Sequence, residues 1–201
     1  MTVGGPGADQ ASGLAADGQG GALVAARIEG ADALIGGLSA KRSGEEDTVV
    51  ARLSADGKPM WAKFLAIDAK LVGGGDDGAT LFGKVGATTT LGGVAVAQHY
   101  LMRVNGDGAI AWVVALPAST EHVGGAGPKG RTAFAFRRAD GKIDLRVVDA
   151  AGAALWTWLG PSVSPPSALV VHADGGVVGL GMVGGAKGFA PTLPAAPTWT
   201  R

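Results

Sequence analysis

The sequence contains no cysteine, which excludes disulfide bonds, cysteine-ligated metal sites and thiol nucleophiles. It also lacks a basic block, because 17 Lys and Arg are matched by 17 Asp and Glu. A nucleic-acid-binding surface or a polybasic membrane-surface patch needs such a block, so we expect neither. No run of about 18 apolar residues is present to cross a bilayer. The start, MTVGGPGADQASG, lacks the basic and apolar regions of a signal peptide.

Glycine is the residue in excess, at 36 of 201 residues, whereas proline contributes only 10. The glycines stand between runs rich in Val, Leu and Ala, a pattern unlike that of a disordered linker. Many short strands joined by tight turns fit this composition, because glycine adopts positive φ without steric cost. No segment combines helical periodicity with helix caps. The sequence therefore predicts an all-β fold.

One eight-residue phrase occurs three times, as SADGKPMW at 54–61, NGDGAIAW at 105–112 and DAAGAALW at 149–156. Each copy has a glycine four residues before its tryptophan, which pairs Gly57 with Trp61, Gly108 with Trp112 and Gly152 with Trp156. Apolar runs flank each copy, so each predicts a β-hairpin with the glycine in its turn. Self-similarity at this spacing is typical of repeat architectures, and it predicts that these tryptophans and glycines form the structural core of the repeat.

A second turn signal precedes each copy, and a fourth such signal appears at HADGGVVGLGMV, residues 172–183. Two hairpins per repeat give four strands, which is the number in a blade of a β-propeller. We therefore predict one β-propeller domain over 1–201, with about three and a half blades of four antiparallel strands. The predicted blades span 10–66, 67–117 and 118–160, followed by a half blade at 161–189 and a proline-rich tail at 190–201.

The number of residues between the two turns of a blade varies, whereas the length of each hairpin is constant. The variation therefore falls between the second and third strands, on one face of the predicted propeller, where insertions usually mark a binding face. The candidate partner-binding residues in these connections are Lys41, Arg42, Glu45, Glu46 and Asp47 in the first blade and Arg137 and Arg138 in the third. A solvated loop of mixed charge explains the same residues.

Other candidate chemistry has a simpler explanation. The three histidines, His99, His122 and His172, have no spacing typical of metal ligands. The segments Asp76–Gly78 and Asn105–Gly108 resemble parts of calcium loops, but turn-forming Asp and Asn residues explain both. No nucleophile elbow, zinc-protease motif or phosphate loop is present. We expect no catalytic residue, cofactor or metal.

The segment DTVVARLSADGKPMW at 47–61 resembles the bacterial β-propeller repeats of the SBBP type. It is also similar to the repeats of pyrroloquinoline-quinone propellers. The resemblance extends over most of 10–160, although the third copy has Ala-Gly in place of Asp-Gly and the fourth repeat has only its first hairpin. It implies that the repeated tryptophans pack between blades, and that the protein belongs to the cell envelope or exterior.

Three and a half blades do not close a ring. The open edges must then be covered by association with other copies, by further blades of a longer propeller, or by the tail; we favour the first two. The expected function is a non-catalytic scaffold or a module that binds a protein partner. The alternatives are a carbohydrate-binding propeller and a fragment of a quinoprotein-type dehydrogenase, since a propeller fold does not by itself imply a function.

Overall fold

The computed structural model describes residues 3–4, 7–29, 32–35, 37–41, 47–75, 78–118, 122–160, 167–172 and 174–180. These residues form β-strands and turns, with a single 3-10 turn, η1 (Pro128–Gly130), as the helical element among them. The chain divides into two compact units, Met1–Ala118 and Ser119–Arg201. The predicted all-β class is confirmed.

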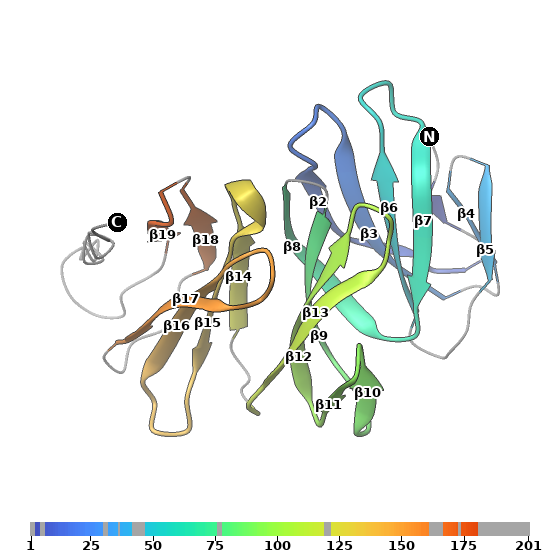
Figure 1. The fold of residues 1–201 in the computed structure, drawn as a ribbon. Helices are drawn as coiled ribbons and strands as arrows, with labels where there is room; N and C mark the ends of the chain where they lie inside the picture. The colour runs from blue at the N-terminus through green and yellow to red at the C-terminus, as the bar shows by residue number, and fades with distance from the viewer. Residues whose placement is uncertain are drawn as a thin grey trace. The chain divides into compact units, whose positions relative to one another are not determined.

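The first unit contains two four-stranded antiparallel sheets in which each strand pairs with the next sheet strand along the chain (Figure 1). The first sheet consists of β2 (Gln10–Ala16), β3 (Ala22–Ile28), β6 (Asp47–Leu53) and β7 (Pro59–Leu65). The second sheet consists of β8 (Asp68–Gly75), β9 (Gly78–Lys84), β12 (His99–Asn105) and β13 (Ile110–Leu116).

The second unit contains one complete sheet of the same kind and a half sheet. The third sheet consists of β14 (His122–Ala126), β15 (Thr132–Arg137), β16 (Ile143–Val148) and β17 (Ala154–Leu159). The half sheet consists of β18 (Ala168–Val171) and β19 (Val177–Leu180). The predicted four-stranded antiparallel sheets are confirmed, while closure of these sheets into a ring stays a prediction. The tail at 190–201 lies outside the described residues.

The repeated sequence phrase forms the turn between the third and fourth strands of each sheet. In the first sheet the Gly57 N–H donates to the Ser54 carbonyl oxygen at 2.9 Å, and the Ser54 N–H donates to the Lys58 carbonyl oxygen at 2.8 Å. This pattern is a type I turn followed by a bulge whose glycine has positive φ. Gly57, Gly108 and Gly152 occupy the same position, with φ of 78°, 82° and 81°. Glycine recurs there because the backbone of this turn requires it.

The connection between the second and third strands differs from sheet to sheet, as the spacing of the turns predicted. In the first sheet it carries the hairpin of β4 (Asp32–Ile35) and β5 (Leu38–Lys41), which also pairs with β1 (Val3–Gly4). In the second sheet it carries the hairpin of β10 (Thr89–Leu91) and β11 (Val94–Val96). In the third sheet it is only a turn, closed by the Arg138 N–H donating to the Lys142 carbonyl oxygen at 2.9 Å.

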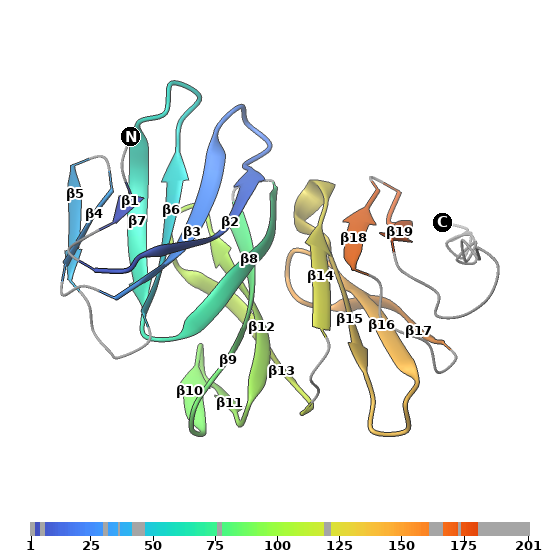
Figure 2. The ribbon, with the colours of Figure 1, turned by 180° about the vertical axis from the view of Figure 1, so that it is seen from behind.

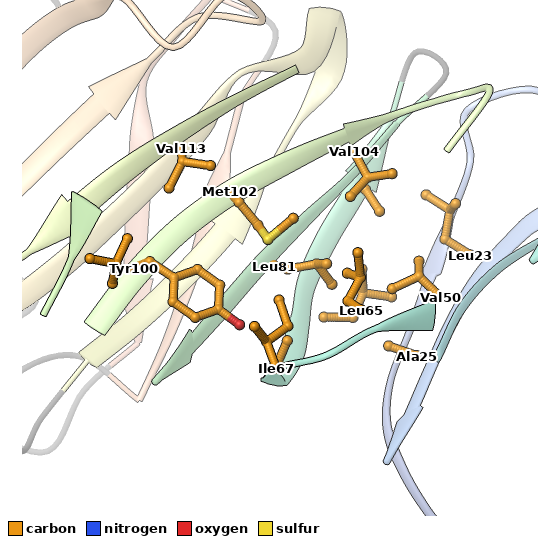
Figure 3. Packing of buried hydrophobic residues seen from close by; sticks show 14 residues of the cluster. Leu23, Ala25, Val50, Leu65, Ile67, Leu81, Tyr100, Met102, Val104 and Val113 are labelled. Atoms are coloured by element: carbon orange, nitrogen blue, oxygen red, sulfur yellow. The ribbon is translucent and has the colours of Figure 1, made fainter. Parts of the chain in front are cut away.

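The first and second sheets pack face to face around a shared apolar core (Figure 3). Side chains alternate between the two faces of a strand, so every second residue enters this core. The fully buried contributors that Figure 3 labels are Leu23, Ala25 and Val50 from the first sheet and Leu81, Tyr100, Met102 and Val104 from the second. In the second unit the third sheet packs in the same manner on the half sheet, through Ala133, Ala135, Leu145, Val147, Leu169 and Val171.

The first strands of neighbouring sheets lie against each other, β2 against β8 in the first unit and β14 against β18 in the second. A Cβ atom added at Gly13 would lie 2.7 Å from the Leu71 Cβ and 2.9 Å from the Leu71 carbonyl oxygen. A Cβ atom added at Gly125 would overlap the carbonyl oxygen of Leu169. These glycines have no positive φ, so they are needed for close approach of two backbones and not for a turn.

Tyr100 ties the third strand of the second sheet to the first strand. Its ring passes over β9 at Gly83, the residue paired with it, and its hydroxyl donates to the Asp68 carbonyl oxygen at 3.0 Å. A Cβ atom on Gly83 would overlap both the hydroxyl and that carbonyl oxygen. Burial, with a smaller effect of the Asp68 charge, raises the pKa of Tyr100 far above its usual range. The hydroxyl therefore stays protonated and remains a donor.

Replacing Gly13 with alanine should destabilise the first unit by about 1–3 kcal/mol, because the added methyl group meets the β8 backbone. Gly86→Ala is the matched control, since a Cβ atom there has open space around it. The free energy of unfolding from urea denaturation is the measurement. Equal values for the two variants would contradict the close approach of β2 and β8.

Candidate functional site

The residues predicted to bind a partner lie in the connections between second and third strands. Lys41 is the last residue of β5, while Arg42, Glu45 and Glu46 lie outside the described residues. Asp47 is placed differently from the expectation of a solvated loop residue. It is the first residue of β6 and is fully buried. A side chain with no exposed surface is not open to contact from a partner.

Arg137 and Arg138 flank the end of β15, where Arg137 is half-buried and Arg138 is exposed. The Arg138 Nε atom lies 3.5 Å from the Asp140 Oδ1 atom, and both side chains are nearly half exposed. An exposed pair of this kind contributes little to stability because water and salt screen it. The Arg138 side chain therefore lies at the surface, in a weak ion pair with Asp140.

The most buried of the described ion pairs lies elsewhere, at the turn between β2 and β3. The Arg52 Nε atom donates to the Asp17 Oδ2 atom at 2.9 Å, and these side chains are only 8% and 2% exposed. The Asp17 Oδ1 atom accepts the N–H groups of Gln19 and Gly21, each at 2.8 Å. Burial by itself would raise the pKa of Asp17, but these three hydrogen bonds hold it below its usual value.

A buried arginine recurs at the same register position of the second sheet. Arg52 lies opposite Trp61 in the β6–β7 ladder, and Arg103 lies opposite Trp112 in the β12–β13 ladder. The Arg103 Nη2 atom donates to the Gly75 carbonyl oxygen at 2.8 Å, near the turn that follows β8. Both arginines thus tie the third strand of a sheet to the end of its first strand. The sequence signal for them is an arginine nine residues before the tryptophan, which the sequence analysis missed.

The third sheet departs from this pattern, with Val147 opposite Trp156. Its buried charge is Asp144, whose two carboxylate oxygens accept from the Arg146 Nε and Nη2 atoms at 2.9 Å each. The Arg146 guanidinium also lies over the Phe136 ring, 5.3 Å from its centre. The hydrogen bonds that Arg146 donates to Asp144 raise the pKa of Arg146. This bidentate pair holds a buried carboxylate within the third sheet.

The three repeated tryptophans lie on the fourth strands, β7, β13 and β17, and are half-buried. Trp61 packs against the core between the first and second sheets, and Trp156 packs against the core of the second unit. The Trp156 Nε1 atom donates to the Gly175 carbonyl oxygen at 3.3 Å, in the turn between β18 and β19. Trp156 therefore links the third sheet to the half sheet.

The histidines that the structure describes have different surroundings. His99 is half-buried and stacks on Phe82 with ring centres 6.0 Å apart. Burial, with the nearby Lys84 charge, lowers the pKa of His99. His172 is exposed, and the side chain of His122 is outside the description. Within the described ranges, no three His, Cys, Asp or Glu side chains gather closely enough to hold a metal ion.

Of the two segments that resemble calcium loops, the structure describes only the one at Asn105–Gly108. The Asp107 Oδ1 atom accepts the Ala109 N–H at 2.9 Å within the turn that contains Gly108. This carboxylate therefore supports the turn. Asp76 and Asp77 are outside the described residues. In the portion of the chain that the structure describes, no helix has the length and apolarity needed to span a bilayer.

Replacing Asp17 with asparagine should destabilise the protein by about 3 kcal/mol at pH 7, because the Arg52 charge stays buried without its counter-charge. This loss of stability is at the low end of the range for breaking a buried ion pair. The reason is that the Gln19 Oε1 atom still accepts a hydrogen bond from Arg52 at 3.0 Å. Asp56→Asn is the matched control, because Asp56 pairs with Lys58 at the surface and its loss should change little.

The same variant has a defined pH dependence. Because the pKa of folded Asp17 lies below the unfolded value of 3.8, its stabilising contribution is complete above about pH 4 and is lost as the pH falls through the folded pKa. The stability difference between the native protein and Asp17→Asn should therefore shrink below about pH 4. A difference that stays constant from pH 7 to pH 2 would contradict the ion pair.

Comparison with known proteins does not assign the chain to a family. It matches no protein-family model, and no curated protein matches its sequence. The argument for function therefore depends on the residues and sheets described above.

Proposed function

We propose that this chain is a non-catalytic scaffold or binding module built as a β-propeller. Its three four-stranded sheets are the blades, and the half sheet is part of a fourth. The observation that carries the proposal is the packing within each unit. The face of one sheet covers the next sheet, and the first strands of both lie side by side. Blades of a propeller are arranged in this manner around a central axis.

The buried charges support a structural and binding role for the sheets. Asp17, Arg52, Arg103 and Asp144 each have a fixed partner inside a sheet or at its turn. Charges held in this way stabilise a rigid framework, and rigid frameworks commonly present binding residues on their connections. The variable connections, with Lys41 and Arg138 at their ends, are the expected contact points for a protein partner. The resemblance of 47–61 to SBBP-type repeats favours such a role at the cell envelope or exterior.

The half sheet provides the route for self-association. Within the described residues β19 pairs with β18 only, so its outer edge offers backbone N–H and carbonyl groups to another strand. Two copies that pair through β19 would form one four-stranded sheet, equal in size to the other three. Val170 and Val178 lie opposite each other in the half sheet, and each is 56% exposed.

Light scattering coupled to size exclusion should give a discrete mass of twice 19.8 kDa. Val178→Lys should shift the protein towards the monomer, because a lysine on an edge strand opposes pairing with a second edge. Val170→Lys is the matched control on the inner strand and should leave the dimer intact. A monomeric native protein, or equal effects of the two lysines, would contradict association through β19.

The non-catalytic assignment has a separate test. Addition of pyrroloquinoline quinone and Ca²⁺ should produce no saturable dehydrogenase activity, and a glycan array should show no shared sugar specificity. Saturable activity would favour the quinoprotein alternative and overturn the scaffold. Several glycans bound with one shared specificity would favour a carbohydrate-binding propeller.

A further inference from the structure

The two faces of the first sheet are covered by different parts of the chain. On one face Leu23, Ala25 and Val50 pack against the second sheet. On the other face the alternate residues of the same strands form a separate apolar cluster, which Ile35 of β4 joins with no exposed surface of its own. The members of this second cluster from the first sheet are Ala26, Ile28, Val49, Ala51, Ala62 and Phe64.

The cover on that second face is a small sheet of β1, β4 and β5, paired in the order β1–β4–β5. In Figure 2, β4 and β5 lie on the side of the first sheet opposite to β8. Contacts of β1 with β3 and of β5 with β7 hold the small sheet against the first sheet. A face that would otherwise present Val, Ile and Phe side chains to water is therefore closed by the chain itself.

The covered face has the chemistry of a face that binds another sheet. Its residues are apolar, as are those that pack on the second sheet from the opposite face. The second sheet of this chain already packs on an apolar face of the first sheet. A second copy of the chain carries sheets of the same kind, which could pack on the other face. Large apolar faces left exposed on a protein mark association sites.

We propose that the small sheet is a built-in cap, which prevents a second copy from docking on the outer face of the first sheet. This inference goes beyond the proposed function and does not rest on it, because it follows from the packing of the first unit alone. Terminal repeats with an altered outer face serve the same purpose in repeat proteins.

The cap is small enough to open separately from the sheet beneath it. Its strands have two, four and four residues, whereas each strand of the first sheet has seven. β1 pairs with β4 at only two positions, Val3 with Ile35 and Gly4 with Leu34. Segments with few backbone hydrogen bonds open at a lower free energy than the core.

The first test is Ile35→Asp, which places a charge in the apolar contact and should detach the cap. The variant should show a larger mass than the native protein at the same concentration in light scattering, together with increased binding of an apolar dye. Leu38→Asp is the matched control in β5, since Leu38 is 37% exposed, and it should keep the native mass. A folded Ile35→Asp variant with native mass and native dye binding would overturn the proposal.

A second measurement applies even if Ile35→Asp does not fold. The chain has no cysteine, so Ile35→Cys and Leu38→Cys each introduce a single thiol whose labelling rate reports its exposure. Ile35→Cys should label at least about tenfold more slowly than Leu38→Cys, and its labelling should proceed by an opening that is faster than global unfolding. Equal labelling rates, or labelling of Ile35→Cys only on global unfolding, would overturn a separable cap.

Discussion

The close approach of neighbouring first strands is the constraint on which the rest of the structure depends. The first strands of neighbouring sheets come together at one edge of the apolar core that the two sheets share. Gly13 against Leu71 and Gly125 against Leu169 leave no room for a side chain at that edge. The abundance of glycine in this chain therefore has two separate causes, because the glycines of the turns are required by φ and those of the first strands by distance.

Buried polar side chains connect the strands within each of the first two sheets. Tyr100 and Arg103 reach from the third strand to carbonyl oxygens on the first strand of the same sheet. Arg52 makes the corresponding connection to Asp17 in the first sheet. Each of these side chains reaches a hydrogen-bond acceptor on another strand or turn of its own sheet. Inside a low-dielectric core, hydrogen bonds of this kind add rigidity, and the loss of a partner is costly.

The hairpins were the part of the fold that the sequence could predict. Their turns contain glycine at a fixed position, as at Gly57. Their strands are either continuously apolar or alternate apolar with polar residues. Neighbouring residues are therefore enough to predict each hairpin. The Asp17–Arg52 pair could not be predicted in the same way, because 35 residues separate its members. Ile35 was missed for a similar reason. The segment that contains it looked like a variable loop, and only tertiary packing shows that it covers Val49 and Ala51. Asp47 was assigned to that loop, but it is the buried start of β6.

The order of the strands has a consequence for how the protein is made. Every four-stranded sheet pairs strands that follow one another in the chain, interrupted at most by a short hairpin. Contacts between such strands close smaller loops than contacts between distant parts of a chain do. Each sheet therefore has all of its strands once its fourth strand leaves the ribosome. The cap on the first sheet is encoded before that sheet is complete, so the first apolar face to form is covered from the beginning, when nascent chains are most prone to aggregate.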